Sequence, residues 1–166
     1  MRKLYFVVTV LLTAAVTLQL YLAAVGVFSN PEDELFAWHG TNGRIVLPIL
    51  ALLTIVTAAL ARAGKRLIWL SVLPLVLIIF QTLIFVFGGM IFGLGPDDHA
   101  SPPLGATLFI ALHGLNGAAI LFVSGWLVVR SRRLMREPMP RRTVPAAAPA
   151  NDTASEPGPV EAGVTP

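Results

Sequence analysis

The chain has 166 residues, of which 55% are hydrophobic and 13% are charged, with a formal net charge of +3 and no cysteine. An ordinary soluble domain carries about 25% charged residues, so this composition argues against one. The lack of cysteine excludes disulfides, thiolate catalysis and cysteine-ligated metal sites.

Four uncharged apolar segments follow one another along the chain. A membrane span needs roughly 17–25 predominantly apolar residues, and its backbone groups need the internal partners that a helix supplies. The sequence therefore predicts an all-α, integral membrane four-helix bundle within residues 1–136. The spans are expected at about 4–28, 35–62, 67–94 and 104–130. Residues 137–166 are Pro/Ala-rich and are expected to form a disordered cytoplasmic tail.

Proline positions predict local features of the second and third helices. Acidic residues follow Pro31 directly, which is typical of a first helical turn, so the second helix is expected to begin near Pro31. Pro48 and Pro74 lie inside predicted spans. Each removes a helical hydrogen bond and is expected to bend its helix.

Basic residues flank the spans on one side. Of the 12 Lys and Arg residues, all except Arg44 lie before the first span, between the second and third, or after the fourth. The other two connections carry the acids Glu32, Asp33, Glu34, Asp97 and Asp98. Basic segments stay cytoplasmic, so we expect a multi-pass protein of a bacterial plasma membrane with both termini cytoplasmic. This placement indicates contact with the lipid bilayer and argues against a nucleic-acid partner.

A His-Gly-x-Asn-Gly pentad occurs twice, at 39–43 and 113–117. A glutamine lies seven residues before a glycine in each half, as Gln19 before Gly26 and as Gln81 before Gly88. These pairs predict that the bundle consists of two tandem two-helix repeats. Because residues three apart share a helix face, His and Asn of each pentad are expected to form a polar ridge beside a strip of glycines.

The depth of the histidines follows from the helical rise of about 1.5 Å per residue. His113 is expected ~26 Å above Arg130 and His39 ~34 Å above Arg62. In a hydrocarbon core ~30 Å thick, His113 then lies in the outer third and His39 near the outer surface.

The most specific functional hypothesis is a small electron-transfer membrane protein that binds haem b. His39 and His113 would be the axial ligands of the haem iron, since neutral imidazole is a common haem ligand and a parallel repeat places them on opposing helices. The polar neighbours would orient the rings, and these are Gln19, Gln81, Asn42 and Asn116. Arg44 would pair with a haem propionate. The predicted difference in depth counts against this hypothesis.

The residues leave several alternatives open. The His, Asn and Gln side chains could hydrogen-bond one another across helices and fix their register. The chain would then be a non-enzymatic accessory or scaffold subunit that associates with another membrane protein or with a second copy. A quinone, another small hydrophobic ligand or a transported solute could also bind there. Arg44 could extend outward to Glu34 or Asp97.

The repeated Gln, Gly, His and Asn positions resemble an uncharacterised bacterial family of small four-helix membrane proteins, a domain of unknown function, over about residues 4–130. That resemblance implies no known activity. More distantly, paired histidines on a two-fold four-helix bundle resemble haem A synthase and transmembrane b-type cytochromes. This resemblance implies haem ligation by His39 and His113. The chain has one His per repeat and lacks the carboxylate of a haem A synthase site, so enzymatic activity is not expected.

Overall fold

A computed structural model of the chain describes residues 1–93 and 101–137. Four helical segments in it are long and apolar enough to cross a membrane. They are α1 (Arg2–Phe28), a composite of α2 (Phe36–Thr41), η2 (Asn42–Val46) and α3 (Leu47–Leu60), α4 (Lys65–Phe92), and α5 (Leu104–Arg136). The predicted all-α class is confirmed. The tail predicted for 137–166 lies, apart from its first residue, outside the described residues.

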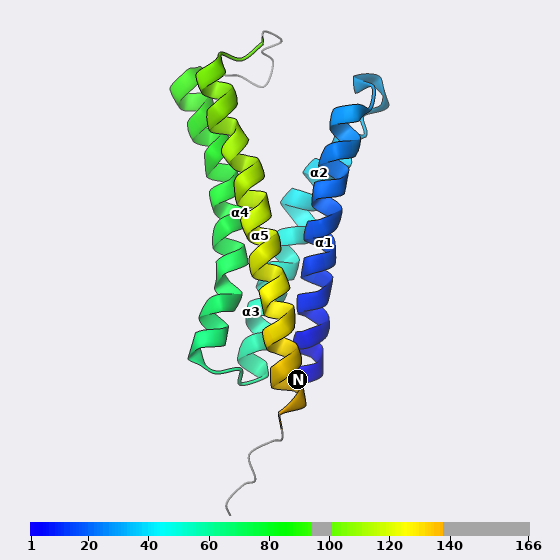
Figure 1. Cartoon of the computed structure of the whole chain (residues 1–166), viewed down its shortest axis with the longest axis vertical. Helices are drawn as coiled ribbons and strands as arrows, with labels where there is room; N and C mark the ends of the chain where they lie inside the picture. Colours follow the sequence, from blue (N-terminus) through cyan, green and yellow to red (C-terminus); the bar gives the residue numbers. More distant parts are fainter. Residues whose placement is uncertain (94–100, 138–166) are drawn as a thin grey trace, which may run out of the picture.

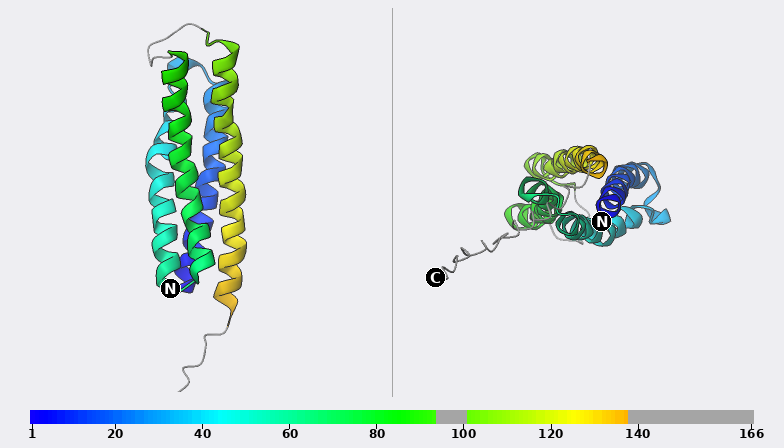
Figure 2. Two further views of the ribbon diagram at one scale, coloured as in Figure 1. Left: turned by 90° about the vertical axis from the view of Figure 1, so that its left-hand side faces the viewer. Right: turned by 90° about the horizontal axis from the view of Figure 1, so that it is seen from below.

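The four segments pack as a ring in which each packs mainly against two others. Helix α1 packs against α3 and α5, and α4 packs against the same two helices, so α1 and α4 lie diagonally opposite. The N-terminus, the turn from α3 to α4 and the end of α5 meet at one end, which carries Arg2, Lys65 and Arg130 and is called the basic end below (Figures 1 and 2). Toward the opposite end, the α1–α2 pair diverges from the α4–α5 pair (Figure 1).

Helices approach one another closely through small and hydroxyl side chains near the basic end. Tyr5 on α1 shares a 2.8 Å hydrogen bond with Ser71 on α4, and Thr9 on α1 shares one of 2.8 Å with Ser131 on α5. All four side chains are fully buried. Because lipid removes the hydrophobic drive for helix association, such contacts hold transmembrane helices together. Both of these bonds join the first helical hairpin, which consists of α1 and the second span, to the second hairpin, which consists of α4 and α5.

The second span begins later than the sequence predicts. Pro31 begins a short 3-10 helix, η1 (Pro31–Asp33), and the membrane helix starts at Phe36, so the prediction of a start near Pro31 is wrong. The reason is Glu34, whose φ of +50° is left-handed and separates the two helical pieces.

A π-helical turn interrupts the same span just before Pro48. Proline has no N–H, and its ring clashes with the carbonyl four residues earlier, which here belongs to Arg44. The helix widens at this point into η2, where Leu47 N–H donates to the carbonyl of Asn42. The distortion predicted at Pro48 therefore takes the form of a π turn. Pro74, by contrast, lies within the continuous helix α4.

Close approach of α1 and α2 generates a first prediction. A Cβ on Gly26 would lie 2.9 Å from the Cα of Phe36, and backbone cannot move aside as a flexible side chain can. Gly26→Ala is therefore expected to lower the free energy of unfolding by roughly 1–3 kcal/mol. This loss outweighs the gain in helix propensity of about 1 kcal/mol.

The measurement is denaturant unfolding in detergent, followed by circular dichroism. Gly125→Ala is the matched control, because no atom lies within 4 Å of a Cβ at Gly125. Its stability is expected to stay unchanged or to rise slightly. Equal effects of the two substitutions would show that α1 and α2 are not in close contact at Gly26.

Candidate functional site

The first polar cluster joins α1 to the second span. Gln19 Nε2 donates to the backbone carbonyl of His39 at 3.0 Å, and Gln19 Oε1 accepts from Asn42 Nδ2 at 2.7 Å. Asn42 Nδ2 also donates to the carbonyl of Ala15 at 3.1 Å. His39 and Asn42 are both buried. We call Gln19, His39 and Asn42 the first triad.

The second polar cluster joins α4 to α5 in the same manner. Gln81 Nε2 donates to the carbonyl of His113 at 2.9 Å, and Asn116 Nδ2 donates to Gln81 Oε1. Asn116 Nδ2 also donates to the carbonyl of Leu77 at 2.8 Å. Gln81, His113 and Asn116 form the second triad.

The two triads use corresponding bonds. In each, the asparagine donates both to the glutamine and to the carbonyl of the residue four positions before that glutamine, which is Ala15 in one case and Leu77 in the other. A helical residue and the residue four before it share a face, so a single amide reaches both acceptors. Each triad is closed within one hairpin, because the glutamine lies on the first helix of the hairpin and the other two members lie on the second.

The histidine tautomers follow from the partners of the ring nitrogens. His39 Nδ1 lies 3.1 Å from the carbonyl oxygen of Gln19, which can only accept, so Nδ1 carries the hydrogen. His39 Nε2 lies 3.2 Å from Gln19 Nε2, which can only donate, so this nitrogen accepts. In the second triad Gln81 Nε2 donates to His113 Nδ1, so the hydrogen of neutral His113 is on Nε2. The two imidazoles are thus assigned as opposite tautomers.

The two imidazole rings meet between the hairpins. Their centroids are 6.0 Å apart and the ring planes are inclined by 58°. The predicted difference in depth of ~8 Å is therefore too large, because the two rings cannot differ in depth by more than the distance between their centroids.

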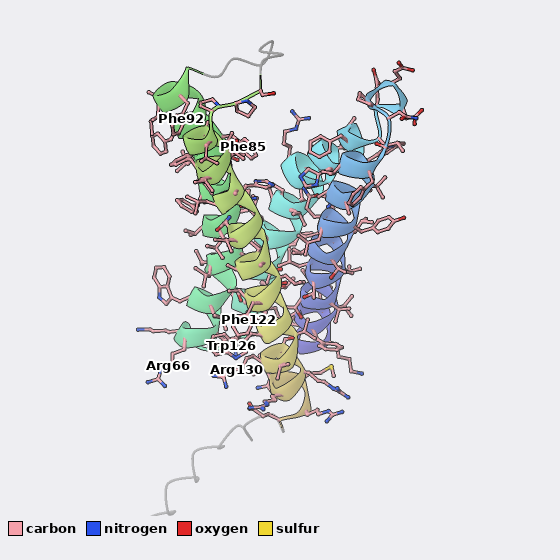
Figure 3. The ribbon with its side chains drawn as sticks, turned by 45° about the horizontal axis from the view of Figure 1, so that its top comes forward. Arg66, Phe85, Phe92, Phe122, Trp126 and Arg130 are labelled. Atoms are coloured by element: carbon pink, nitrogen blue, oxygen red, sulfur yellow. The ribbon has the colours of Figure 1, made fainter. Side chains whose placement is uncertain are left out.

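Two phenylalanines flank the imidazoles and were not singled out from the sequence. Phe36 stacks on His39 with centroids 5.0 Å apart, and Phe85 meets His113 edge-on at 4.8 Å. Phe85 lies in the half of the bundle away from the basic end (Figure 3). The sequence spacing could have indicated both contacts. Phe36 lies three residues before His39 and Phe85 lies four residues after Gln81, so each phenylalanine shares a helix face with that triad residue.

The pentad glycines have unequal roles. A Cβ on Gly43 would lie 2.8 Å from Gln19 Nε2, so the absence of a side chain at Gly43 leaves room for the glutamine amide. A Cβ on Gly117 would lie 3.7 Å from Leu20 Cδ2, which is ordinary contact between α5 and α1. Nothing lies within 4 Å of a Cβ at Gly114. The predicted glycine strip therefore serves packing at Gly43 and leaves open space at Gly114.

Arg44 is exposed and bonds to its own helix. Its Nε donates to the carbonyl of Gly40 at 3.2 Å. Within the described residues this is the one hydrogen bond of its side chain, and no ion pair joins it to Glu34. Asp97, the other predicted partner, lies outside the described residues.

Axial haem ligation by His39 and His113 would have to replace hydrogen bonds of the triads. A ligating imidazole offers the iron a nitrogen lone pair. That nitrogen is Nε2 in His39 and Nδ1 in His113, and each accepts a hydrogen from a glutamine amide. In the part of the chain that the structure describes, no group of three or more His, Cys, Asp or Glu side chains is placed to hold a metal.

Four spanning helices with mutually bonded polar side chains define a small multi-pass membrane protein. Residues 19–88 match the sequence model of a family of unknown function, DUF6220. The matched segment contains the first triad and Gln81 of the second. No curated protein and no solved structure matches the chain. None of these comparisons supports the predicted resemblance to haem A synthase or to b-type cytochromes.

The shared bonding of the triads generates a second prediction. Asn42→Leu and Asn116→Leu are each expected to lower the free energy of unfolding by about 1–3 kcal/mol, because each leaves a glutamine oxygen without its donor and removes a second bond to a helical backbone carbonyl. Denaturant titration in detergent measures the loss. Thr41→Val is the control, since the Thr41 hydroxyl is exposed and bonds to its own helix.

A double-mutant cycle tests whether the triad acts as a unit. Gln81→Leu combined with Asn116→Leu should cost clearly less than the sum of the single substitutions, because the second change removes a donor that has already lost its acceptor. Additive losses would show that the two amides are not coupled.

Proposed function

We propose that the chain is a non-enzymatic accessory or scaffold protein of the membrane, in which each triad fastens one helical hairpin. The observation that carries this proposal is the hydrogen bonding of the buried side-chain polar groups. Among the described residues, no buried side-chain nitrogen or oxygen lacks a hydrogen-bond partner. Catalytic and transport sites keep polar groups available for a substrate, whereas these glutamine and asparagine amides are engaged with their own bundle.

The outer surface of the bundle supports a role in association. In each span, 22–28% of the residues in the most apolar window are buried inside the bundle, and many large apolar side chains are exposed on its surface. Lipid covers such a surface, and a second membrane protein can replace part of that lipid. The partner in this proposal is another membrane protein or a second copy of the chain.

Two further parts of the proposal concern origin and orientation. The corresponding bonds of the triads support a bundle of two tandem repeats, each a hairpin. The distribution of basic residues supports a bacterial plasma membrane protein with the basic end, and therefore both termini, in the cytoplasm.

Orientation gives a third prediction, which the cysteine-free sequence makes simple to test. Asn30→Cys and Glu137→Cys place single thiols at opposite ends of the bundle, and both positions are exposed. In intact cells a membrane-impermeant maleimide should label the thiol at position 30 and leave the thiol at position 137 unlabelled. Permeabilised cells are the control, in which both thiols should react. The reverse pattern in intact cells would place the basic end outside.

A haem b protein is the second candidate, and one observation favours it. The imidazole centroids of His39 and His113, from opposite hairpins, are 6.0 Å apart, so the two rings the hypothesis requires do lie together. Binding would require Gln19 and Gln81 to release the nitrogens that they now contact. The accessory proposal needs no such rearrangement.

A fourth prediction separates these two candidates. Protein expressed with ample haem and purified in mild detergent is expected to be colourless, and added haemin should leave both its visible spectrum and its thermal midpoint unchanged. A ligand that binds the folded state would raise that midpoint.

The opposite result would overturn the accessory proposal. It consists of a Soret band with sharp α and β bands on reduction, lost in both His39→Ala and His113→Ala. Thr41→Val, an exposed change next to Asn42, is the matched control and should leave any such spectrum intact.

A further inference from the structure

A second site lies at the basic end, away from the triads. The turn from α3 to α4, the first turn of α4 and the last turns of α5 surround a cavity of about 560 Å³. Four cationic side chains line it, and they are Lys65, Arg66, Arg130 and Arg133. Among the described residues, Glu137 is the one carboxylate in the lining.

The cavity concentrates positive charge from two separate elements. Lys65 and Arg66 begin α4, while Arg130 and Arg133 belong to α5, so the fold brings together cations that are about 65 residues apart in sequence. The first turn of α4 contains no acidic residue, and its N-cap, Gly64, provides no side-chain bond. The positive end of the helix dipole therefore adds to the side-chain charge. Such a concave site attracts an anion.

An aromatic stripe leads from the membrane-facing surface to this cavity. Phe122, Trp126 and Arg130 are spaced four residues apart and share one face of α5. Figure 3 shows the two aromatic residues above Arg130, with Arg66 from α4 at a similar level. The aromatic centroids are 6.5 Å apart, and the side chains are 73% and 48% exposed, respectively. An apolar surface thus runs directly into a cationic one.

We propose that this cavity binds the phosphate headgroup of an anionic phospholipid, whose acyl chains lie along Phe122 and Trp126. The order along α5, with the aromatic residues Phe122 and Trp126 followed by the cavity residue Arg130, matches the order of chain and headgroup in a phospholipid. Basic cavities between transmembrane helices have the chemistry that anionic headgroups require. A zwitterionic lipid carries its own cation beside the phosphate, and it therefore gains less from four cationic side chains.

The test measures lipid binding to the purified full-length protein in detergent by native mass spectrometry. The probes are phosphatidylglycerol and phosphatidylcholine with identical acyl chains. Phosphatidylglycerol should bind at least tenfold more tightly. Arg66→Gln combined with Arg130→Gln should weaken phosphatidylglycerol binding at least tenfold and reduce the preference over phosphatidylcholine.

The matched control is Arg132→Gln combined with Arg136→Gln. It removes the same charge from the same end, yet neither residue lines the cavity. Its affinity for phosphatidylglycerol should remain within twofold of the unaltered protein. Equal losses in the two double variants would overturn the proposal, because general positive charge rather than the cavity would then attract the lipid.

Two further comparisons use protein that is certain to fold. In the unaltered protein, equal affinity for the two lipids would overturn the proposal. Full displacement of phosphatidylglycerol by millimolar inorganic phosphate would also overturn it, because the cavity would then be a site for a free anion. Retention of the lipid under that competition supports the contribution of the aromatic stripe.

Discussion

An amide buried in hydrocarbon is costly unless its donors and acceptor find partners inside the protein, and this constraint organises the half of the bundle away from the basic end. Asn42 and Asn116 each satisfy their two donors through one nitrogen, which donates to a glutamine side chain and to a backbone carbonyl. The glutamine then reaches the backbone of the histidine. The same hydrogen bonds therefore determine which two helices pair in each hairpin and in which register they pack.

Two kinds of polar contact hold the bundle together, one within each hairpin and one between the hairpins. The triads operate within a hairpin, whereas the hydroxyl pairs of Tyr5 with Ser71 and of Thr9 with Ser131 operate between hairpins. The hydroxyl pairs lie toward the basic end, and the triads lie farther from it, in the direction in which the hairpins diverge (Figure 1). Each hairpin therefore keeps its internal register in the region where it receives least support from the other.

Much of this arrangement could be predicted from the sequence, and the rest had no sequence signal. Apolar length predicted the spans, and the three-residue spacing of His and Asn predicted shared faces. The carbonyls of Ala15 and Leu77 could not be identified, because a backbone acceptor leaves no trace in residue type. The π turn before Pro48 was also missed, since a proline within a helix can be accommodated by a kink or by a wider turn.

The opposite tautomers of the two histidines have a consequence for the symmetry of the molecule. His39 uses both ring nitrogens within its own hairpin, while the Nε2 hydrogen of His113 is used by no hydrogen bond among the described residues. Two halves with the same sequence pattern therefore present different faces where they meet. The ring nitrogens of His39 are both hydrogen-bonded, whereas His113 keeps an N–H donor. The contact between the two hairpins is therefore asymmetric, and exchanging the hairpins would not reproduce it.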